Sequence, residues 1–298
     1  MNAPRAAVLR LLSPVLDRAG SAYLVGPGLD AGVAVAHDLL ARADGVTLAY
    51  WNRAGDPAAE VLAQGLAAVE SLRGTGGRAA VAVKVPALRS DPAAVEQLAA
   101  RAADADVGLA FDSHSPADAE ATLTMAELAG RAGARTTVAL PGQWARSLTD
   151  VDRVVRADLV VRLVKGQWPD EQAGPGRFGE AHLRDSYLAV LDRLIEAGAR
   201  IRLATHDAAL LDEGLARLAR SGADHEAELL LGMPVHRARA VALRHGVRVR
   251  WYLAFGHPSL AYPLTSVVGR PRIAATLAQG VLLGARNQQK QKQAALRH

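Results

Sequence analysis

The chain has 298 residues, of which 50% are hydrophobic and 22% are charged, and its formal net charge is +5. This balance is typical of a soluble folded protein and excludes a disordered or fibrous chain. The length allows one large α/β barrel or two ordinary domains. Because the sequence has no cysteine, disulfides, cysteine-ligated zinc, iron–sulfur clusters and a thiol nucleophile are also excluded.

Much of the positive charge lies at the C-terminal end of the chain. Residues 286–298 contain four basic side chains and no acidic one, so the rest of the chain is nearly neutral. We interpret this segment as a flexible basic tail, with a nucleic-acid or lipid-headgroup contact as the alternative. Aromatic residues make up only 4% of the chain, which leaves little material for base stacking, so we do not expect nucleic acid as a partner.

The hydropathy of the sequence indicates whether any segment could span a membrane. No uncharged apolar run approaches the ~18 residues that are needed to span a bilayer. We therefore expect a cytoplasmic protein without stable membrane insertion, and the alternative is a peripheral contact of the basic tail with a membrane.

Short β-rich runs alternate with Ala/Leu/Arg segments of helical period along the chain. The expected strands are Val46–Trp51, Ala80–Val85, Val107–Phe111, Thr136–Leu140, Leu159–Val164, Ile201–Ala204, Glu228–Leu231 and Val247–Leu253. The expected helices include Ala58–Leu72, Ala93–Ala103, Pro116–Ala132, Ala181–Ala197, Ala208–Ser221 and His236–His245.

This pattern predicts a (β/α)8 TIM barrel, a single domain over residues 1–298 with a helix before the first strand. A doubly wound open sheet is the alternative, but no G-x-G-x-x-G motif follows the first strand. The sequence shows no internal repeat beyond the βα unit.

Polar residues at the C-terminal ends of barrel strands converge on one mouth, so they are the candidates for chemistry. The candidates are Lys84, Asp112, Arg162, Lys165, Thr205, His206, Asp207, Glu228 and Tyr252. Only four of the 35 basic residues are lysines, and the two outside the tail both lie at strand ends. A compact ammonium facing the mouth is the functional interpretation, and an ion pair of Lys84 with Asp112 is the structural one.

Three chemistries could use these side chains. A Schiff-base lyase would take Lys84 or Lys165 as its nucleophile. A metal hydrolase would have only His206 and a few carboxylates, so we expect no metal. A flavin or nucleotide enzyme would use Arg162, Lys165 and His206 as hydrogen-bond donors to phosphates and to the isoalloxazine ring.

Taken in chain order, six segments resemble the proline dehydrogenase family, whose catalytic domain is a distorted (β/α)8 barrel that holds FAD. The most specific is Val161-Arg162-Leu163-Val164-Lys165-Gly166, which looks like the R-L-V-K-G signature of that family's fifth strand. The others are Val81-Ala82-Val83-Lys84, Phe111-Asp112, Ala204-Thr205-His206-Asp207, Leu229-Leu230-Leu231-Gly232-Met233, and Val249-Arg250-Trp251-Tyr252 leading to Phe255-Gly256.

The resemblance implies a role for each matched position. The residues implied to bind a non-covalent FAD are Arg162, Val164, Lys165, Gly166, Thr205, His206 and Glu228, the last where the family usually has Gln. The residues implied to be catalytic are Lys84, Asp112 and Tyr252. The residues implied to line the substrate pocket are Gln167, Trp168, Leu230, Tyr252, Arg270 and Arg272.

The sequence departs from the family pattern in the substrate half of the site. The family's Arg-Arg pair and following Glu, which clamp the carboxylate of proline, align with Thr265, Ser266 and Gly269. A planar guanidinium suits a carboxylate, so its loss should weaken proline binding. The family's fourth-strand Gln aligns with Pro141, which leaves Gln143 as a substitute.

The resemblance therefore implies an FAD-dependent dehydrogenase that oxidises a C–N bond of an amine or imino acid to an imine, with an altered substrate pocket. One alternative is a true L-proline dehydrogenase that gives pyrroline-5-carboxylate, and another is an oxidase acting on an N–N or other amine intermediate. A Schiff-base lyase and a non-catalytic barrel remain as further alternatives. The electron acceptor would be a quinone, oxygen or a carrier.

Overall fold

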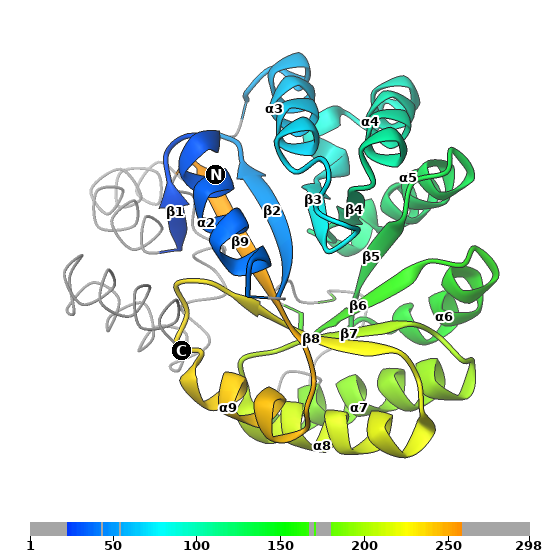
Figure 1. Ribbon diagram of the computed structural model, residues 1–298. Coiled ribbons are helices and arrows are strands. Elements are labelled where there is room, and N and C mark those ends of the chain that lie inside the picture. Colours follow the sequence, from blue (N-terminus) through cyan, green and yellow to red (C-terminus); the bar gives the residue numbers. More distant parts are fainter. Residues whose placement is uncertain (1–22, 43, 54, 167–169, 171–179, 258–298) are drawn as a thin grey trace, which may run out of the picture.

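The computed structural model describes residues 23–42, 44–53, 55–166, 170 and 180–257, and it contains a closed barrel of eight parallel strands (Figure 1). The barrel strands are β2 (Gly45–Trp51), β3 (Ala79–Val83), β4 (Gly108–Phe111), β5 (Thr136–Pro141), β6 (Val160–Val164), β7 (Ile201–Ala204), β8 (His225–Leu230) and β9 (Val249–Gly256). The barrel closes because β9 pairs with both β8 and β2. The predicted (β/α)8 fold is confirmed.

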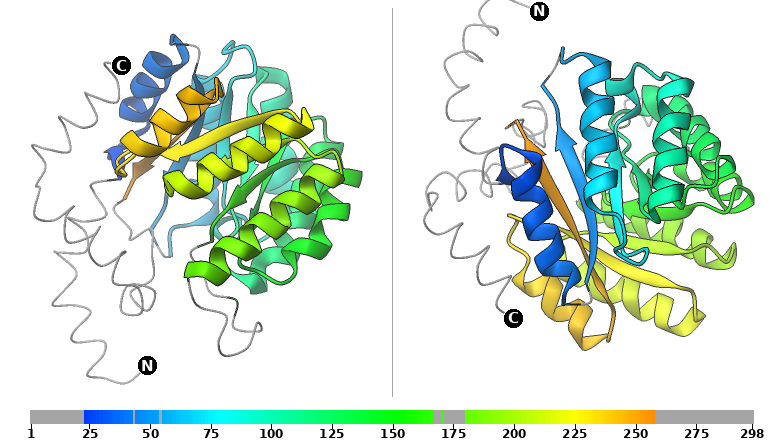
Figure 2. Two further views of the ribbon diagram at one scale, coloured as in Figure 1. Left: turned by 90° about the horizontal axis from the view of Figure 1, so that it is seen from below. Right: turned by 45° about the horizontal axis from the view of Figure 1, so that its top comes forward.

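The helices cover the outside of this barrel (Figures 1 and 2). They are α2 (Leu29–Leu40), α3 (Ala58–Ser71), α4 (Pro92–Ala105), α5 (Ala119–Arg131), α6 (Ser147–Arg156), α7 (Glu180–Glu196), α8 (Ala208–Ser221) and α9 (His236–Arg244), with short 3-10 turns η1 (Val85–Leu88) and η2 (Pro116–Asp118). No helix within these described ranges is both long and apolar enough to cross a bilayer.

A strand and a helix precede the first barrel strand, and of the two only the strand was not expected. A short strand, β1 (Leu24–Gly26), pairs with the outer part of β9. Helix α2 precedes β2 and packs against both β2 and β9, the two strands at which the barrel closes. Helix α2 therefore covers the place where β2 and β9 pair to close the barrel.

Side chains of each strand alternate between the helices and the barrel interior. In β6, Val161 and Leu163 are fully buried in the main hydrophobic core, while Arg162 and Val164 belong to the other face. Because successive side chains of a strand point to opposite faces, this pattern places the polar residues of the candidate site inside the barrel. The strand sequence therefore decides which residues face the mouth.

The barrel interior holds buried charged side chains near the N-terminal ends of the strands, opposite the mouth. The Arg250 guanidinium lies 2.8 Å from Glu226 and donates to the carbonyl oxygens of Val46 and Arg78. Arg202 lies 3.3 Å from the same carboxylate, and burial lowers the pKa of Arg202 to about 10. TIM barrels are ordinarily filled by branched aliphatic side chains, so this ionic layer is a departure that the strand pattern alone did not predict.

The turns that lead into the strands reveal a repeat of two βα units, which corrects the expectation of no repeat. Strands β2, β4, β6 and β8 follow the dipeptide Ala-Asp, and β3, β5, β7 and β9 follow Gly-x-Arg. The aspartates are Asp44, Asp106, Asp158 and Asp224, and the arginines are Arg78, Arg135, Arg200 and Arg248.

Two of these arginines form ion pairs with the aspartate of the preceding turn. Arg135 lies 3.1 Å from Asp106, and Arg200 lies 2.9 Å from Asp158. Both guanidinium groups also donate to backbone carbonyl oxygens of the preceding Asp turn. These ion pairs lie at the N-terminal ends of the strands, on the face of the barrel opposite the mouth, where they serve stability.

Candidate functional site at the barrel mouth

Asp112 is the centre of the polar network at the mouth. It follows β4 directly, and its side chain is almost fully buried. The hydroxyl of Tyr252, from β9, donates to Asp112 Oδ2 at 2.6 Å, and Nη1 of Arg162, from β6, donates to Asp112 Oδ1 at 2.9 Å. Three strands distant in the sequence are thereby joined through one carboxylate.

Arg162 connects this carboxylate to a second one. Its Nε lies 3.3 Å from Oε1 of Glu228, on β8, and its guanidinium carbon lies 4.7 Å from the ring centroid of Tyr252. Burial by itself would lower the pKa of Arg162, but the carboxylates of Glu228 and Asp112 outweigh burial and raise it. Arg162 is therefore a permanent cation stacked on an aromatic ring.

Tyr252 is a neutral hydrogen-bond donor in this network. Burial and the adjacent Asp112 carboxylate raise the pKa of Tyr252 well above its usual value. The hydroxyl therefore stays protonated and donates a hydrogen bond to Asp112.

Lys84 lies immediately after β3, and its Nζ lies 5.8 Å from the ring centroid of Trp51. Burial lowers the pKa of Lys84 to about 8, and the negative charge of Asp112 partly opposes this effect. Asp112 is paired with Arg162 and Tyr252, so its effect on Lys84 is a longer-range attraction. The ion pair of Lys84 with Asp112, the structural alternative in the sequence analysis, is therefore not formed.

His206 follows β7 and accepts a hydrogen bond. The backbone N–H of Leu230 donates to its Nε2 at 3.0 Å. Burial, together with the Arg162 charge, lowers the pKa of His206 to about 4, so the imidazole is neutral and carries its proton on Nδ1. This bond ties the end of β7 to the end of β8.

The residues around His206 form the start of α8. The Asp207 carboxylate accepts hydrogen bonds from the first turn of the helix, and Oγ1 of the buried Thr205 accepts the Asp207 N–H at 3.2 Å. Lys165 Nζ lies 3.4 Å from Asp207 Oδ2. Asp207 therefore places the Lys165 ammonium beside a helix N-terminus, where anions bind favourably.

The backbone conformation and the close packing at position 166 favour glycine. The φ of Gly166 is +91°, and a Cβ would lie 2.7 Å from Nε2 of Gln143, on the loop after β5. The Gln143 side chain therefore lies against Gly166, the residue that follows Lys165. The loop after β6 can therefore approach the loop after β5 only with glycine here.

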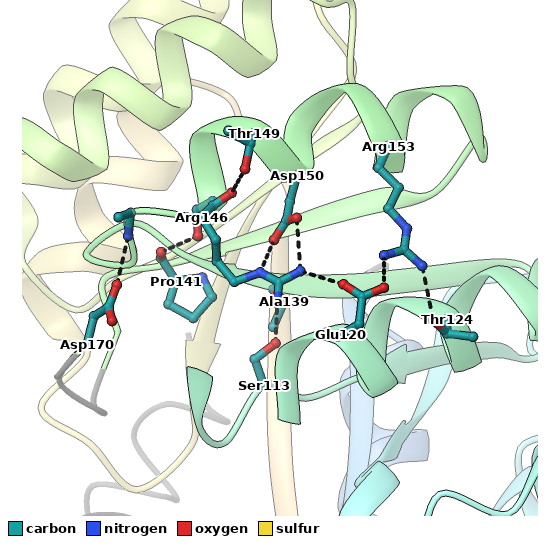
Figure 3. Close-up of polar contacts among 12 residues, drawn as sticks. Ser113, Glu120, Thr124, Ala139, Pro141, Arg146, Thr149, Asp150, Arg153 and Asp170 are labelled. Atoms are coloured by element: carbon teal, nitrogen blue, oxygen red, sulfur yellow. Dashed lines mark hydrogen bonds and ion pairs between the residues drawn. The ribbon is translucent and has the colours of Figure 1, made fainter. Parts of the chain in front are cut away.

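The loop after β5 is held by polar contacts on its outer side (Figure 3). The Ser147 hydroxyl donates to the Pro141 carbonyl at 2.7 Å, and the Ala145 N–H donates to Asp170 at 3.0 Å. Arg146 lies 2.7 Å from Asp150 and 2.9 Å from Glu120, on α5. These contacts fix the loop that carries Gln143.

Inside the mouth, small and aromatic apolar residues form a second cluster separate from the core under the helices. Its buried members are Tyr23, Leu24, Ala49, Trp51, Tyr252 and Ala254, with Ala82, Leu230 and Met233 packed against them. The predicted pocket residues Leu230 and Tyr252 are thus together. The predicted residues Gln167, Trp168, Arg270 and Arg272 lie outside the described residues, as do Thr265, Ser266 and Gly269.

Sequence reasoning missed one mouth residue, His114. It lies two positions after Asp112, and its Nε2 is buried with no hydrogen-bond partner in the described part of the chain. Its place just beyond the end of β4 was the signal that could have found it. The described residues contain no group of three His, Asp or Glu side chains arranged to hold a metal.

Comparison with known proteins gives the fold. No family model and no curated protein sequence match the chain. Proline utilization A (PutA) from Bdellovibrio bacteriovorus, inactivated by N-propargylglycine, is similar with a TM-score of 0.68 at 17% identity, over 88% of this chain and 33% of that one. A PutA mutant from Bradyrhizobium japonicum gives 0.64 at 18% identity, over 87% of this chain and 33% of that one.

A third structure, a bifunctional PutA, has a TM-score of 0.61 at 21% identity, over 80% of this chain and 29% of that one. The chain therefore spans about a third of the length of the first two of these structures. The barrel is the one found in part of the PutA chains, which agrees with the fold expected from the resemblance.

Proposed function

We propose that the protein is an FAD-dependent dehydrogenase of the proline dehydrogenase type, which oxidises a C–N bond of an amine or imino acid to an imine. The observation that carries this proposal is the buried network of Arg162, Asp112 and Tyr252 at the mouth of a PutA-like barrel. Each of the three residues comes from a sequence segment that resembles the proline dehydrogenase family.

The residues at the mouth fit a bound, non-covalent flavin. In the described chain, the buried polar atoms without hydrogen bonds include both carboxylate oxygens of Glu228, one of which forms an ion pair with Arg162 Nε at 3.3 Å that lacks hydrogen-bond geometry. Buried polar groups of this kind are ordinarily satisfied by water or a ligand. The residues that would hold FAD are Arg162, Val164, Lys165, Gly166, Thr205, His206 and Glu228.

When bound, FAD would supply N5 as the acceptor of the substrate hydride. The chain contributes position and electrostatics. Tyr252 and Arg162 hold Asp112 in one orientation, and the apolar cluster around Trp51 and Leu230 keeps water from the reacting carbon. Neutral His206 offers its Nδ1–H without adding charge beside Arg162.

Lys84 would set the charge of the substrate half of the site. With a pKa of about 8, its ammonium is only partly populated in slightly alkaline solution. A neutral amine is the form that can release a hydride, and while Lys84 is protonated its charge disfavours a bound ammonium and so favours the bound neutral amine. Lys84 would act through this electrostatic effect.

The sequence supports an amine other than free L-proline, because Thr265 and Ser266 align with the family's arginine pair. L-Proline itself, giving pyrroline-5-carboxylate, and an N–N compound are the alternatives within the same chemistry. A quinone, oxygen or a carrier protein would reoxidise the flavin.

The first experiment is a visible absorption spectrum of the purified protein, with and without added FAD, followed by anaerobic addition of L-proline and pyrrolidine. Flavin bands that bleach with either amine support the proposal. Bands that bleach with L-proline show that another group holds its carboxylate. Absence of flavin binding, even after reconstitution, refutes the proposal. Asp112→Asn is the matched variant, since it keeps the shape of the side chain but removes its charge.

One observation favours a second function. A buried lysine with a pKa near 8 at a barrel mouth is also the nucleophile that a Schiff-base lyase requires. Borohydride treatment with a carbonyl substrate would trap an adduct on Lys84 in that case, and flavin would not bind. A non-catalytic barrel would give neither flavin bands nor an adduct.

A further inference from the structure

His114 is placed at the mouth by both of its neighbours. The Ser113 hydroxyl donates to the backbone carbonyl of Ala139, on β5, at 2.7 Å (Figure 3). The Ser115 hydroxyl donates to Asp118 at 2.6 Å and accepts the Asp118 N–H at the start of η2. The imidazole therefore projects from a short loop whose residues on both sides are hydrogen-bonded.

The charges around the imidazole are those of the candidate site. Asp112, Lys84, Asp118 and Arg162 all act on His114. These are two carboxylates and two cations, so the surroundings have no net formal charge when Lys84 is protonated. Burial lowers the pKa of His114 below its usual value, and the imidazole is neutral at neutral pH.

Nε2 of His114 is the polar atom that this arrangement leaves open. It is buried, and no donor or acceptor in the described chain reaches it. A buried nitrogen without a partner destabilises the site, and a ligand removes this cost when it supplies the missing hydrogen bond.

The neighbouring side chains select an uncharged ligand group. Arg162 is already engaged by Asp112 and Glu228. Asp112 exerts the largest charge effect on the imidazole, so a carboxylate bound at His114 would lie near a like charge. An amide or hydroxyl group meets no such repulsion and can either donate to or accept from Nε2.

We propose that His114 Nε2 is a specificity-determining hydrogen-bonding group that binds an uncharged polar substituent of the amine substrate. This inference rests on the proposed function and adds the substrate class: amines with a neutral polar group near the reacting C–N bond.

Three pyrrolidines test the proposal, because they differ only at the ring carbon next to nitrogen: L-prolinamide, pyrrolidine and L-proline. Their dissociation constants would be measured by calorimetry on the full chain with FAD added. We expect L-prolinamide to bind about three- to tenfold more tightly than pyrrolidine, the gain of one neutral hydrogen bond. L-Proline should not share this gain.

His114→Leu should equalise the two affinities, and His114→Gln should restore part of the preference because its amide reaches the Nε2 position. His225→Leu is the matched control, since His225 lies at the start of β8, away from the mouth, and bonds to the Ala223 carbonyl. It should behave as the wild type. Histidine-selective NMR would show the His114 signals shifting on addition of L-prolinamide.

A preference that survives in His114→Leu would overturn the proposal. Equal binding of L-prolinamide and pyrrolidine to the wild type, or binding of neither, would also overturn it. A parallel FAD titration keeps the two proposals apart. Bound FAD without the amide preference refutes the role of His114 alone, whereas absence of FAD binding refutes the proposed dehydrogenase.

Discussion

Substitution of Tyr252 by Phe isolates one hydrogen bond of the mouth network. The hydroxyl donates to Asp112 Oδ2 at 2.6 Å in a buried setting. Phe keeps the aromatic face on which Arg162 stacks, so the lost interaction is the bond to the carboxylate. A hydrogen bond to a charged group contributes about 1.5–3 kcal/mol, and we expect the free energy of unfolding to fall by this amount.

Tyr187→Phe is the matched control. This residue is fully buried, and its hydroxyl donates to the neutral carbonyl oxygen of Leu163 at the longer distance of 3.3 Å. A neutral bond contributes about 0.5–1.5 kcal/mol, so the control should lose less stability than Tyr252→Phe. Both variants lose the same atom from the same kind of side chain.

The assay is urea unfolding followed by circular dichroism. The slope of the unfolding free energy against urea concentration, the m value, must stay the same in all variants. A loss in Tyr252→Phe no greater than that in Tyr187→Phe would refute the view that the charge of Asp112 strengthens the bond. Turnover in the FAD-loaded protein should also fall in Tyr252→Phe while FAD affinity is retained.

Three further predictions concern pH and glycine. Burial lowers the pKa of His206 from 6.5 to about 4, so between these pH values the unfolded chain binds more protons than the folded one. The free energy of unfolding should therefore fall as pH drops through this window, by at most about 3 kcal/mol. The part of this loss that is due to His206 should vanish in His206→Gln. Gly166→Ala should weaken FAD binding in a fluorescence titration by displacing Gln143, whereas Gly198→Ala, with a similar positive φ and open space around it, should lower only stability. Binding of the cationic amine pyrrolidine should tighten as pH rises through about 8, where Lys84 loses its charge, and calorimetry on Lys84→Met should show no such step.

Much of the barrel could be predicted because each strand has its own local signal. The β-rich run from residue 201 to 204 and the helix from 208 to 221 have the bounds that periodicity and the Asp207 cap indicated. Helix α6 was not among the predicted helices, since its first turn follows an irregular loop whose contacts come from α5 and from Asp170.

The sequence by itself determined the order of strands and helices, the residues that end each strand, and therefore which side chains could reach the mouth. Alternation along a strand is a local property, so it needs no knowledge of distant residues. The Ala-Asp and Gly-x-Arg turns are local too, although their regular alternation is plain only when the strands are aligned in space.

Only the tertiary structure decided which partners these side chains have. Asp112 pairs with Arg162 and Tyr252 rather than with Lys84, because barrel closure brings β4, β6 and β9 around one interior. The neutral state of His206 and the unmatched nitrogen of His114 have the same origin. Burial and charge depend on residues that lie far apart in the chain, and local sequence patterns do not specify those distances.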